Sequence, residues 1–280
     1  MKKCPNCGRE YPDDAMVCLI DERPLSAQTP PPVLEELSAG TLATPPAPVR
    51  RIPLTGRQME IIEVILVCLI AFGASILAST YVFFGGIIEH KYNSVAWMGQ
   101  ALREGSCIVL LWYLLQRRGM TFKDLGLTWS WKDVGWSIIL VFAGLMAFGI
   151  IFSLIYHSGL AAFVPKGVGG KVGEFLFGGG VFFSTFLFQC INPFFEELIA
   201  RAYLMTEVRR ITNSVTKAVV ISTALQTSYH FYQGAPAALA HGATFLIFSI
   251  YYAKTNRISP IILAHLYMDV GATIEYALRS

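Results

Sequence analysis

The chain has 280 residues, of which 54% are hydrophobic and only 15% are charged. Soluble globular domains carry about 25% charged residues, so this composition excludes an ordinary cytosolic enzyme. The formal net charge of +3 is small and dispersed, and it gives no reason to expect a nucleic-acid partner. A chain with so little charge is instead typical of a protein embedded in a lipid bilayer.

The first 25 residues are polar and carry three closely spaced cysteines. Cys4 and Cys7 are separated by two residues, which is the spacing of a zinc knuckle. Zn²⁺ takes four tetrahedral ligands, and Cys18 with Asp21 repeats this spacing with a carboxylate in the last position. The segment resembles the short zinc ribbons at the front of many bacterial membrane proteins. We predict a structural zinc at these four residues and a protein partner for the ribbon. The alternatives are a degenerate ribbon that has lost its metal and a site completed by water.

Residues 26–56 contain seven prolines and few large apolar side chains. Such a composition is typical of an extended, largely disordered linker. We therefore predict three parts, which are a zinc ribbon at 1–25, this linker at 26–56 and a transmembrane domain at 57–280.

From about Glu60 the sequence becomes strongly apolar. A bilayer core of about 30 Å requires ~20 apolar residues in a helix, and seven segments meet this length approximately. An apolar soluble core would need polar faces at helical spacing, and the first segment has none. The sequence thus predicts an all-α, polytopic bundle of about seven transmembrane helices. The segments are 60–85, 95–116, 133–156, 177–207, 217–233, 236–253 and 258–278.

The lysines and arginines that flank these segments predict their orientation. Twelve lie on one set of alternate flanks and four on the other. Because positive flanks stay on the cytoplasmic side, we expect a multi-pass cell-membrane protein with its N-terminus in the cytoplasm. Thiols in that reducing compartment are more suited to a metal than to a disulfide.

Ionisable residues at membrane depth are costly and usually functional, and the fourth segment has three of them. Glu197 and Arg201 are four residues apart, so they share a helix face and should pair. Glu196 points about 100° away around the helix and is left free. Pro193 lacks an N–H and should loosen or kink the turn before them. A salt bridge that only packs helices would explain the pair but would leave Glu196 without a partner.

Two later segments add histidines. The fifth carries His230, and the seventh carries His265 with Asp269 four residues on, which predicts that this carboxylate holds the imidazole tautomer. At 1.5 Å per residue, Glu196, His230 and His265 lie ~17, ~20 and ~10 Å from the cytoplasmic ends of their helices. These overlapping depths predict one shared site. His241 is expected to pack or line a cavity, and Arg103 and Glu104 receive no catalytic role.

The motifs Glu-Glu-x-x-x-Arg, a helix ending in His, and His-x-x-x-Asp resemble those of the CAAX protease and bacteriocin-processing (CPBP) family of intramembrane endopeptidases. The resemblance covers about residues 60–280, with the specific motifs in 192–270. Gln226 stands where the family often has Phe, and Asp269 replaces the more usual Asn. The resemblance implies that Glu196 and His230 activate water, that His265 with Asp269 stabilises the oxyanion, and that Glu197 and Arg201 support the first Glu.

Peptide hydrolysis needs a base for water and a donor for the oxyanion, and these residues supply both. Family members are often labelled metalloproteases, and Glu196, His230 and His265 also form a possible His₂Glu zinc set. We favour metal-independent water activation, because no separate base is evident if Glu196 binds metal. The expected substrate is a membrane-associated protein or peptide cut near its C-terminus, with no residue here specifying a prenyl group. A transporter with a polar ion path and a non-catalytic scaffold are the alternatives.

Overall fold

A computed structural model describes residues 2–4, 9–12, 14–18, 25, 56–86, 93–168 and 171–279. The chain separates into two compact units, Met1–Ile52 and Pro53–Ser280, which are described in turn. The predicted zinc ligands Cys7 and Asp21 lie outside the described residues, as does the predicted linker apart from Gly56.

The described part of the first unit centres on a pair of two-residue strands. β1 (Lys2–Lys3) runs antiparallel to β2 (Glu10–Tyr11), with Lys2 opposite Tyr11. A small buried cluster follows from this pairing, and the Tyr11 hydroxyl lies 3.2 Å from the Cys18 sulfur within it. The members of the cluster are Cys4, Tyr11, Cys18 and Leu25. Two of the four predicted zinc ligands are therefore buried together.

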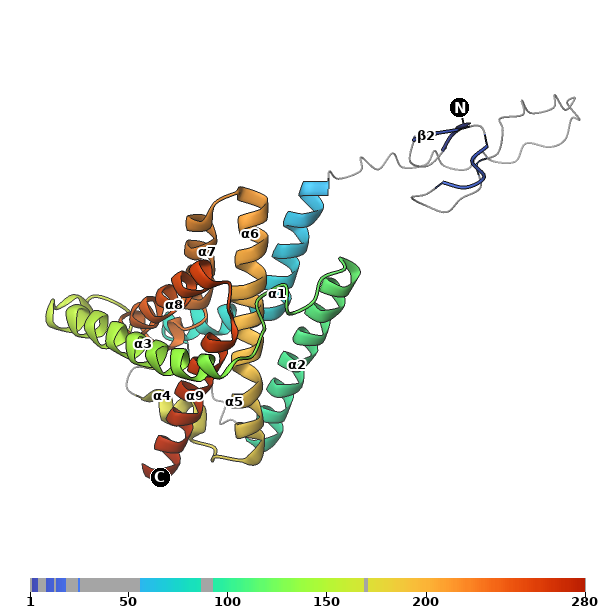
Figure 1. Cartoon of the computed structure of the whole chain (residues 1–280). Helices are drawn as coiled ribbons and strands as arrows, with labels where there is room; N and C mark the ends of the chain where they lie inside the picture. Colours follow the sequence, from blue (N-terminus) through green and yellow to red (C-terminus); the bar gives the residue numbers. More distant parts are fainter. Residues whose placement is uncertain are drawn as a thin grey trace, which may run out of the picture. The chain divides into compact units, whose positions relative to one another are not determined.

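The second unit is all-α, as predicted (Figure 1). Each of the seven predicted segments is helical over most of its length. Four of the helices are long and apolar enough to cross a bilayer, and they expose many large apolar side chains, as lipid-facing helices do. These four are α1 (Gly56–Phe83), α3 (Trp131–His157), α8 (Ala235–Thr255) and α9 (Ser259–Arg279). The protein is thus a multi-pass membrane protein.

The remaining segments are more polar or interrupted. α2 (Ser94–Arg117) carries Arg103 and Glu104 near its middle. The predicted span 177–207 is not one uninterrupted helix, because the short α4 (Val172–Phe177) ends before α5 begins. The predicted span 217–233 consists of α7 (Val215–Ser228) and a separate turn of 3₁₀ helix (Phe231–Gln233).

A change of helical winding marks the centre of the unit. α5 (Phe183–Glu196) continues directly into a π-helix, η3 (Glu197–Tyr203), and then into α6 (Leu204–Thr212). Pro193 lies within α5 and removes one backbone donor. The turn it was predicted to loosen stays α-helical, and the wider winding begins at Glu197 instead.

This central column is the core around which the other helices pack. In Figure 1 it lies between α1 and α2 on one side and α3, α8 and α9 on the other. All seven residues of η3 are buried. The Ser222 hydroxyl of α7 donates to the Ala200 carbonyl oxygen at 2.6 Å and so satisfies a backbone acceptor of the π-helix. Polar side chains on η3 therefore lie deep inside the bundle.

Two close contacts hold α3 in place. The Thr244 hydroxyl of α8 donates to the Gly144 carbonyl oxygen at 2.9 Å, which brings the two backbones together. At the start of α3, the buried Asp133 pairs with Arg257 at 2.7 Å. These contacts join α3 to α8 and to the turn before α9.

A cluster of ion pairs joins the end of α2 to α1 and α6. Arg118 lies 2.7 Å from Glu63 and 2.9 Å from Glu207. Arg210 lies 2.6 Å from Glu207 and 2.7 Å from Glu60. Glu207 is buried, so its two arginines compensate the cost of removing its charge from water.

Candidate active site

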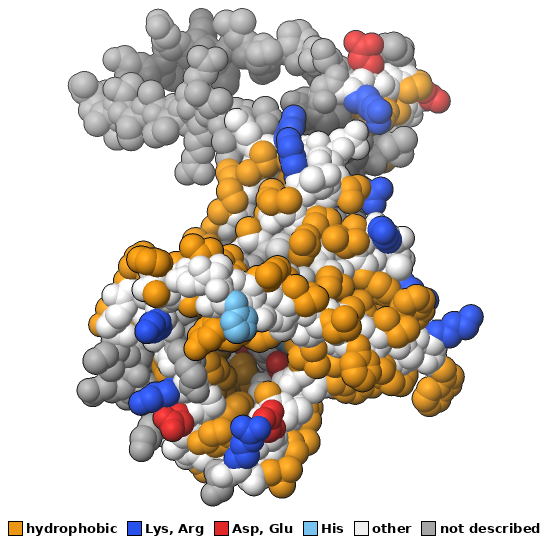
Figure 2. Space-filling view, turned by 90° about the vertical axis from the view of Figure 1, so that its left-hand side faces the viewer, with side chains coloured by type: hydrophobic (Ala, Val, Ile, Leu, Met, Phe, Trp, Pro, Cys, Tyr) orange, Lys and Arg blue, Asp and Glu red, His pale blue; other side chains and the backbone are white. Residues whose placement is uncertain are grey.

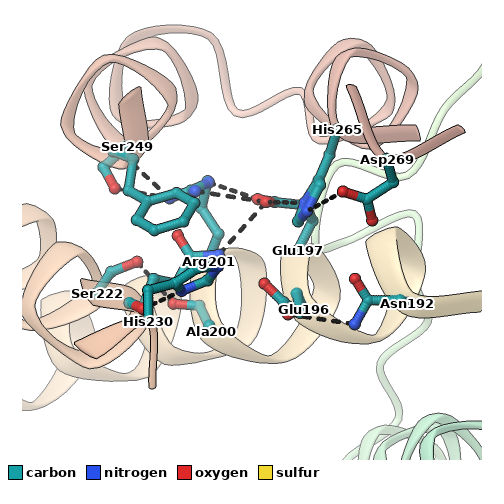
Figure 3. A network of polar contacts seen from close by, with 12 residues as sticks. Asn192, Glu196, Glu197, Ala200, Arg201, Ser222, His230, Ser249, His265 and Asp269 are labelled. Carbon is teal, nitrogen blue, oxygen red and sulfur yellow. Dashed lines mark hydrogen bonds and ion pairs between the residues drawn. The ribbon is translucent and has the colours of Figure 1, made fainter. Parts of the chain in front are cut away.

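The π-helix carries a buried ion pair at the middle of a polar network (Figure 3). The Arg201 Nε lies 2.6 Å from the Glu197 Oε2, and both side chains are 0% exposed. The pair predicted from the spacing of these residues is therefore present. Arg201 Nη1 also donates to the Ser249 hydroxyl at 2.8 Å and to the Phe245 carbonyl oxygen at 3.4 Å. A fully buried guanidinium is stable only with such a set of acceptors.

Gln226 connects this ion pair to α7. Its side-chain oxygen accepts a hydrogen bond from Arg201, and its amide donates to Glu197 Oε1 at 3.4 Å. Its backbone carbonyl oxygen lies 2.9 Å from the Nδ1 of His230. Gln226, at the position where the resembled family often has Phe, thus contacts both Arg201 and Glu197 through its side-chain amide.

His265 reaches the same network from α9. Its Nδ1 lies 2.9 Å from Glu197 Oε1, and its Nε2 lies 3.6 Å from Asp269 Oδ1. Since a carboxylate accepts, the proton on Nδ1 is donated to Glu197. Glu197 is therefore the closer of the two carboxylates that hold the His265 ring. The sequence had predicted Asp269 in this role.

Glu196, which the spacing predicted to be left free by Arg201, has two hydrogen-bond donors of its own. Its Oε2 accepts from the Tyr229 hydroxyl at 2.7 Å, and its Oε1 accepts from the Asn192 amide at 3.2 Å. Glu196 is 8% exposed, unlike the fully buried Glu197. Sequence reasoning missed Tyr229 and Asn192, although one precedes His230 and the other lies four residues before Glu196.

His230 is oriented by the backbone. A carbonyl oxygen only accepts, so the contact with Gln226 puts a proton on Nδ1 and leaves the lone pair of the neutral ring on Nε2. The ring centre lies 4.8 Å from that of Tyr229 and 5.2 Å from that of His241. His241 in turn packs edge-on against Phe148 at 4.8 Å.

The described residues bring acidic and imidazole side chains from α5, η3, α9 and the turn that follows α7 into one region. Within the described ranges, no three His, Cys, Asp or Glu side chains are grouped so that they could hold a metal ion. The described geometry of Glu196, His230 and His265 is therefore not that of a zinc set. Figure 2 shows that this helical unit is hollowed, with hydrophobic side chains around the opening and an acidic side chain visible inside.

Comparisons with known proteins bear on the same part of the chain. No curated protein and no solved structure shows significant similarity to it. One family model matches residues 178–271, and its description is Type II CAAX prenyl endopeptidase Rce1-like. The matched range contains every residue of the network from Asn192 to Asp269. The segment that carries the polar network is thus similar to the Rce1-like type II CAAX prenyl endopeptidases.

Proposed function

We propose that the protein is an intramembrane endopeptidase that hydrolyses a peptide bond near the C-terminus of a membrane-associated protein or peptide. The observation that carries the proposal is Glu196, a buried carboxylate that is held by two donors and directly precedes the Glu197–Arg201 ion pair in the chain. The family of the matched segment supports it. A buried, oriented carboxylate is what a general base for water requires.

In the proposed mechanism, Glu196 takes a proton from water as the water oxygen attacks the substrate carbonyl carbon. The proton then moves to the leaving amine nitrogen as the carbon–nitrogen bond breaks. Tyr229 and Asn192 orient the carboxylate, and the Nε2 lone pair of His230 assists in binding the water. This assignment uses no metal, because a metal-bound Glu196 would leave no separate base. Chelation should leave the cleavage rate unchanged.

His265 is the proposed donor to the oxyanion. Its Nδ1–H is already given to Glu197, so it offers a second donor, on Nε2, only as an imidazolium. Glu197 on one side and Asp269 on the other stabilise that charge. Arg201 acts through Glu197, which it holds in place. A fixed donor in a water-poor site stabilises developing negative charge strongly.

The test is cleavage of a panel of membrane-bound peptides, with and without an isoprenylated cysteine, by the purified full-length protein in liposomes. We expect Glu196→Gln to lower kcat/KM by about 10²–10⁴, the usual contribution of general base catalysis. Glu275→Gln, at an exposed position of α9, is the matched control and should retain the wild-type rate. Equal cleavage by wild type and Glu196→Gln would reject the proposal. Ion flux without cleavage would favour a transporter.

We also propose that the N-terminal unit binds one structural zinc through Cys4, Cys7, Cys18 and Asp21. The burial of Cys4 and Cys18 in one small cluster supports this, since so short a segment has little core of its own. Metal analysis of the purified full-length chain should find zinc in wild type and in Cys190→Ser, whose cysteine is exposed on α5. Cys18→Ser should lose it. Wild-type protein without zinc would contradict the proposal.

A further inference from the structure

Glu104 is a buried carboxyl group for which the mechanism above has no use. It lies in the middle of α2 and is 2% exposed. Its Oε1 accepts from the Asn192 amide at 3.4 Å and from Arg103 Nη2 at 3.3 Å. Its Oε2 is buried and has no hydrogen-bond partner among the described residues. A charged carboxylate with a bare buried oxygen is costly.

The Asn192 amide connects Glu104 to Glu196. The same Nδ2 donates to Glu104 Oε1 at 3.4 Å and to Glu196 Oε1 at 3.2 Å. One NH₂ group therefore bridges two carboxyl groups, one from α2 and one from α5. Two carboxylates so close in a buried site repel strongly, and as a rule one of them keeps its proton.

The two carboxyl groups differ in their partners. Both oxygens of Glu196 accept hydrogen bonds, which favours its ionised form. The titratable groups that face Glu104 are Glu196, Arg103 and the Cys107 thiol.

Arg103 favours ionisation of Glu104, but the Arg103 side chain is 33% exposed. The guanidinium also donates to the Gln100 side chain at 3.0 Å and the Ala71 carbonyl oxygen at 3.1 Å, both shorter than its contact with Glu104. The proton is thus better placed on Glu104.

We propose that Glu104 and Glu196 share one proton that resides on Glu104, so that Glu104 is a positioning residue that keeps Glu196 ionised. The consequence for catalysis rests on the proposed function, whereas the protonation itself does not. The neutral Glu104 carboxyl still accepts from Asn192 and so helps to fix the amide that orients Glu196.

Infrared spectroscopy of the purified full-length protein tests the protonation directly. We expect a carbonyl stretch of a protonated carboxylic acid at neutral pH that is lost in Glu104→Gln and retained in Glu275→Gln. In Glu196→Gln the repelling charge is gone, so the Glu104 band should disappear at a lower pH than in wild type. An unchanged band in Glu104→Gln, or the same titration in Glu196→Gln, would overturn the proposal.

Cleavage rates test the positioning role. Glu104→Ala removes an acceptor of Asn192 and should slow cleavage about 10–100-fold, because the amide that orients Glu196 is then held by one carboxyl group only. Glu104→Gln is neutral and still accepts, so it should restore most of that rate. If Glu104→Gln is as slow as Glu104→Ala, an ionised Glu104 paired with Arg103 is the working form and the proposal fails. A wild-type protein that cleaves nothing would instead refute the protease assignment and leave the infrared result to decide the protonation.

Discussion

Arg201 carries more polar contacts than its position in the core would suggest. It pairs with Glu197, bonds to Gln226, Ser249 and the Phe245 carbonyl oxygen, and lies 5.6 Å from the centre of the Phe248 ring. The guanidinium is planar and presents its donors in fixed directions, so these partners hold one geometry. Glu197, held this way, in turn fixes the ring of His265. Arg201 thus orients Glu197 directly and His265 through Glu197.

The first prediction concerns this cation. Arg201→Gln leaves Glu197 buried without its counter-ion and should lower the free energy of unfolding by about 3–5 kcal/mol. Arg279→Gln is the control, because Arg279 is 77% exposed and pairs with Glu275 at the surface, where ion pairs contribute about 0–1 kcal/mol. Thermal unfolding in one detergent compares them. Equal losses would show that the buried pair contributes no more than a surface pair.

The sequence predicts contacts within a helix, and it predicts that Glu196, His230 and His265 share one site, but it does not give the individual partners across helices. The Glu197–Arg201 pair follows from four-residue spacing alone. The contacts of Glu197 with His265 and of Glu196 with Tyr229 join residues from different helices, and only the packed fold brings them together. The spacing between His265 and Asp269 was correct as a guide to proximity, but at 3.6 Å it does not give the nearest partner.

The π-helix is the element that sets the geometry of the site. Short stretches of such winding occur often at functional sites, because they rotate side chains relative to a regular α-helix. Here it begins at Glu197, directly after Glu196, so the two neighbouring carboxylates belong to differently wound segments. Pro193 predicted that the helix would be irregular near this point. It did not predict that the irregularity is a π-helix or that it begins at Glu197, since both depend on how the surrounding helices pack.

A second prediction concerns the packing of α3 on α8. A Cβ atom at Gly144 would lie 2.8 Å from Thr244 Cγ2, closer than atoms pack, so Gly144→Ala should cost about 1–3 kcal/mol of stability. Gly149→Ala lies on the same helix with nothing within 4 Å, and it should be neutral or stabilise by up to about 1 kcal/mol. Unfolding curves of the two variants in the same detergent check this. If Gly144→Ala unfolds with the wild-type free energy, the close contact between α3 and α8 at Gly144 is contradicted.

For the whole molecule, apolar runs were a good guide to where helices lie. α1 and α9 begin and end within a few residues of the predicted segments 60–85 and 258–278. The short helix α4 was not predicted, and the predicted segment 177–207 begins before α5 does, because the residues on both sides of the break are equally apolar. Hydropathy identifies apolar segments. It does not show where one helix ends and the next begins when both helices are apolar.

The third prediction concerns membrane topology. Among the described residues, four helices are long and apolar enough to cross a membrane, while the predicted spans number seven. Seven crossings, an odd number, would put the two termini on opposite sides, and the lysine and arginine distribution predicts that the N-terminus lies inside. Protease should therefore remove an N-terminal tag only in inside-out vesicles and a C-terminal tag only in right-side-out vesicles. Two tags accessible from the same side would contradict seven spans.

The measurement that tests the account most directly is hydrolysis of a peptide substrate in water enriched in ¹⁸O, with mass analysis of the products. If Glu196 activates water for direct attack, a single turnover of wild type places one ¹⁸O atom in the new C-terminal carboxylate and none in the protein. Glu196→Gln should give almost no product under the same conditions. Label found on a protein carboxyl group, or labelled product formed by Glu196→Gln at the wild-type rate, would contradict the account.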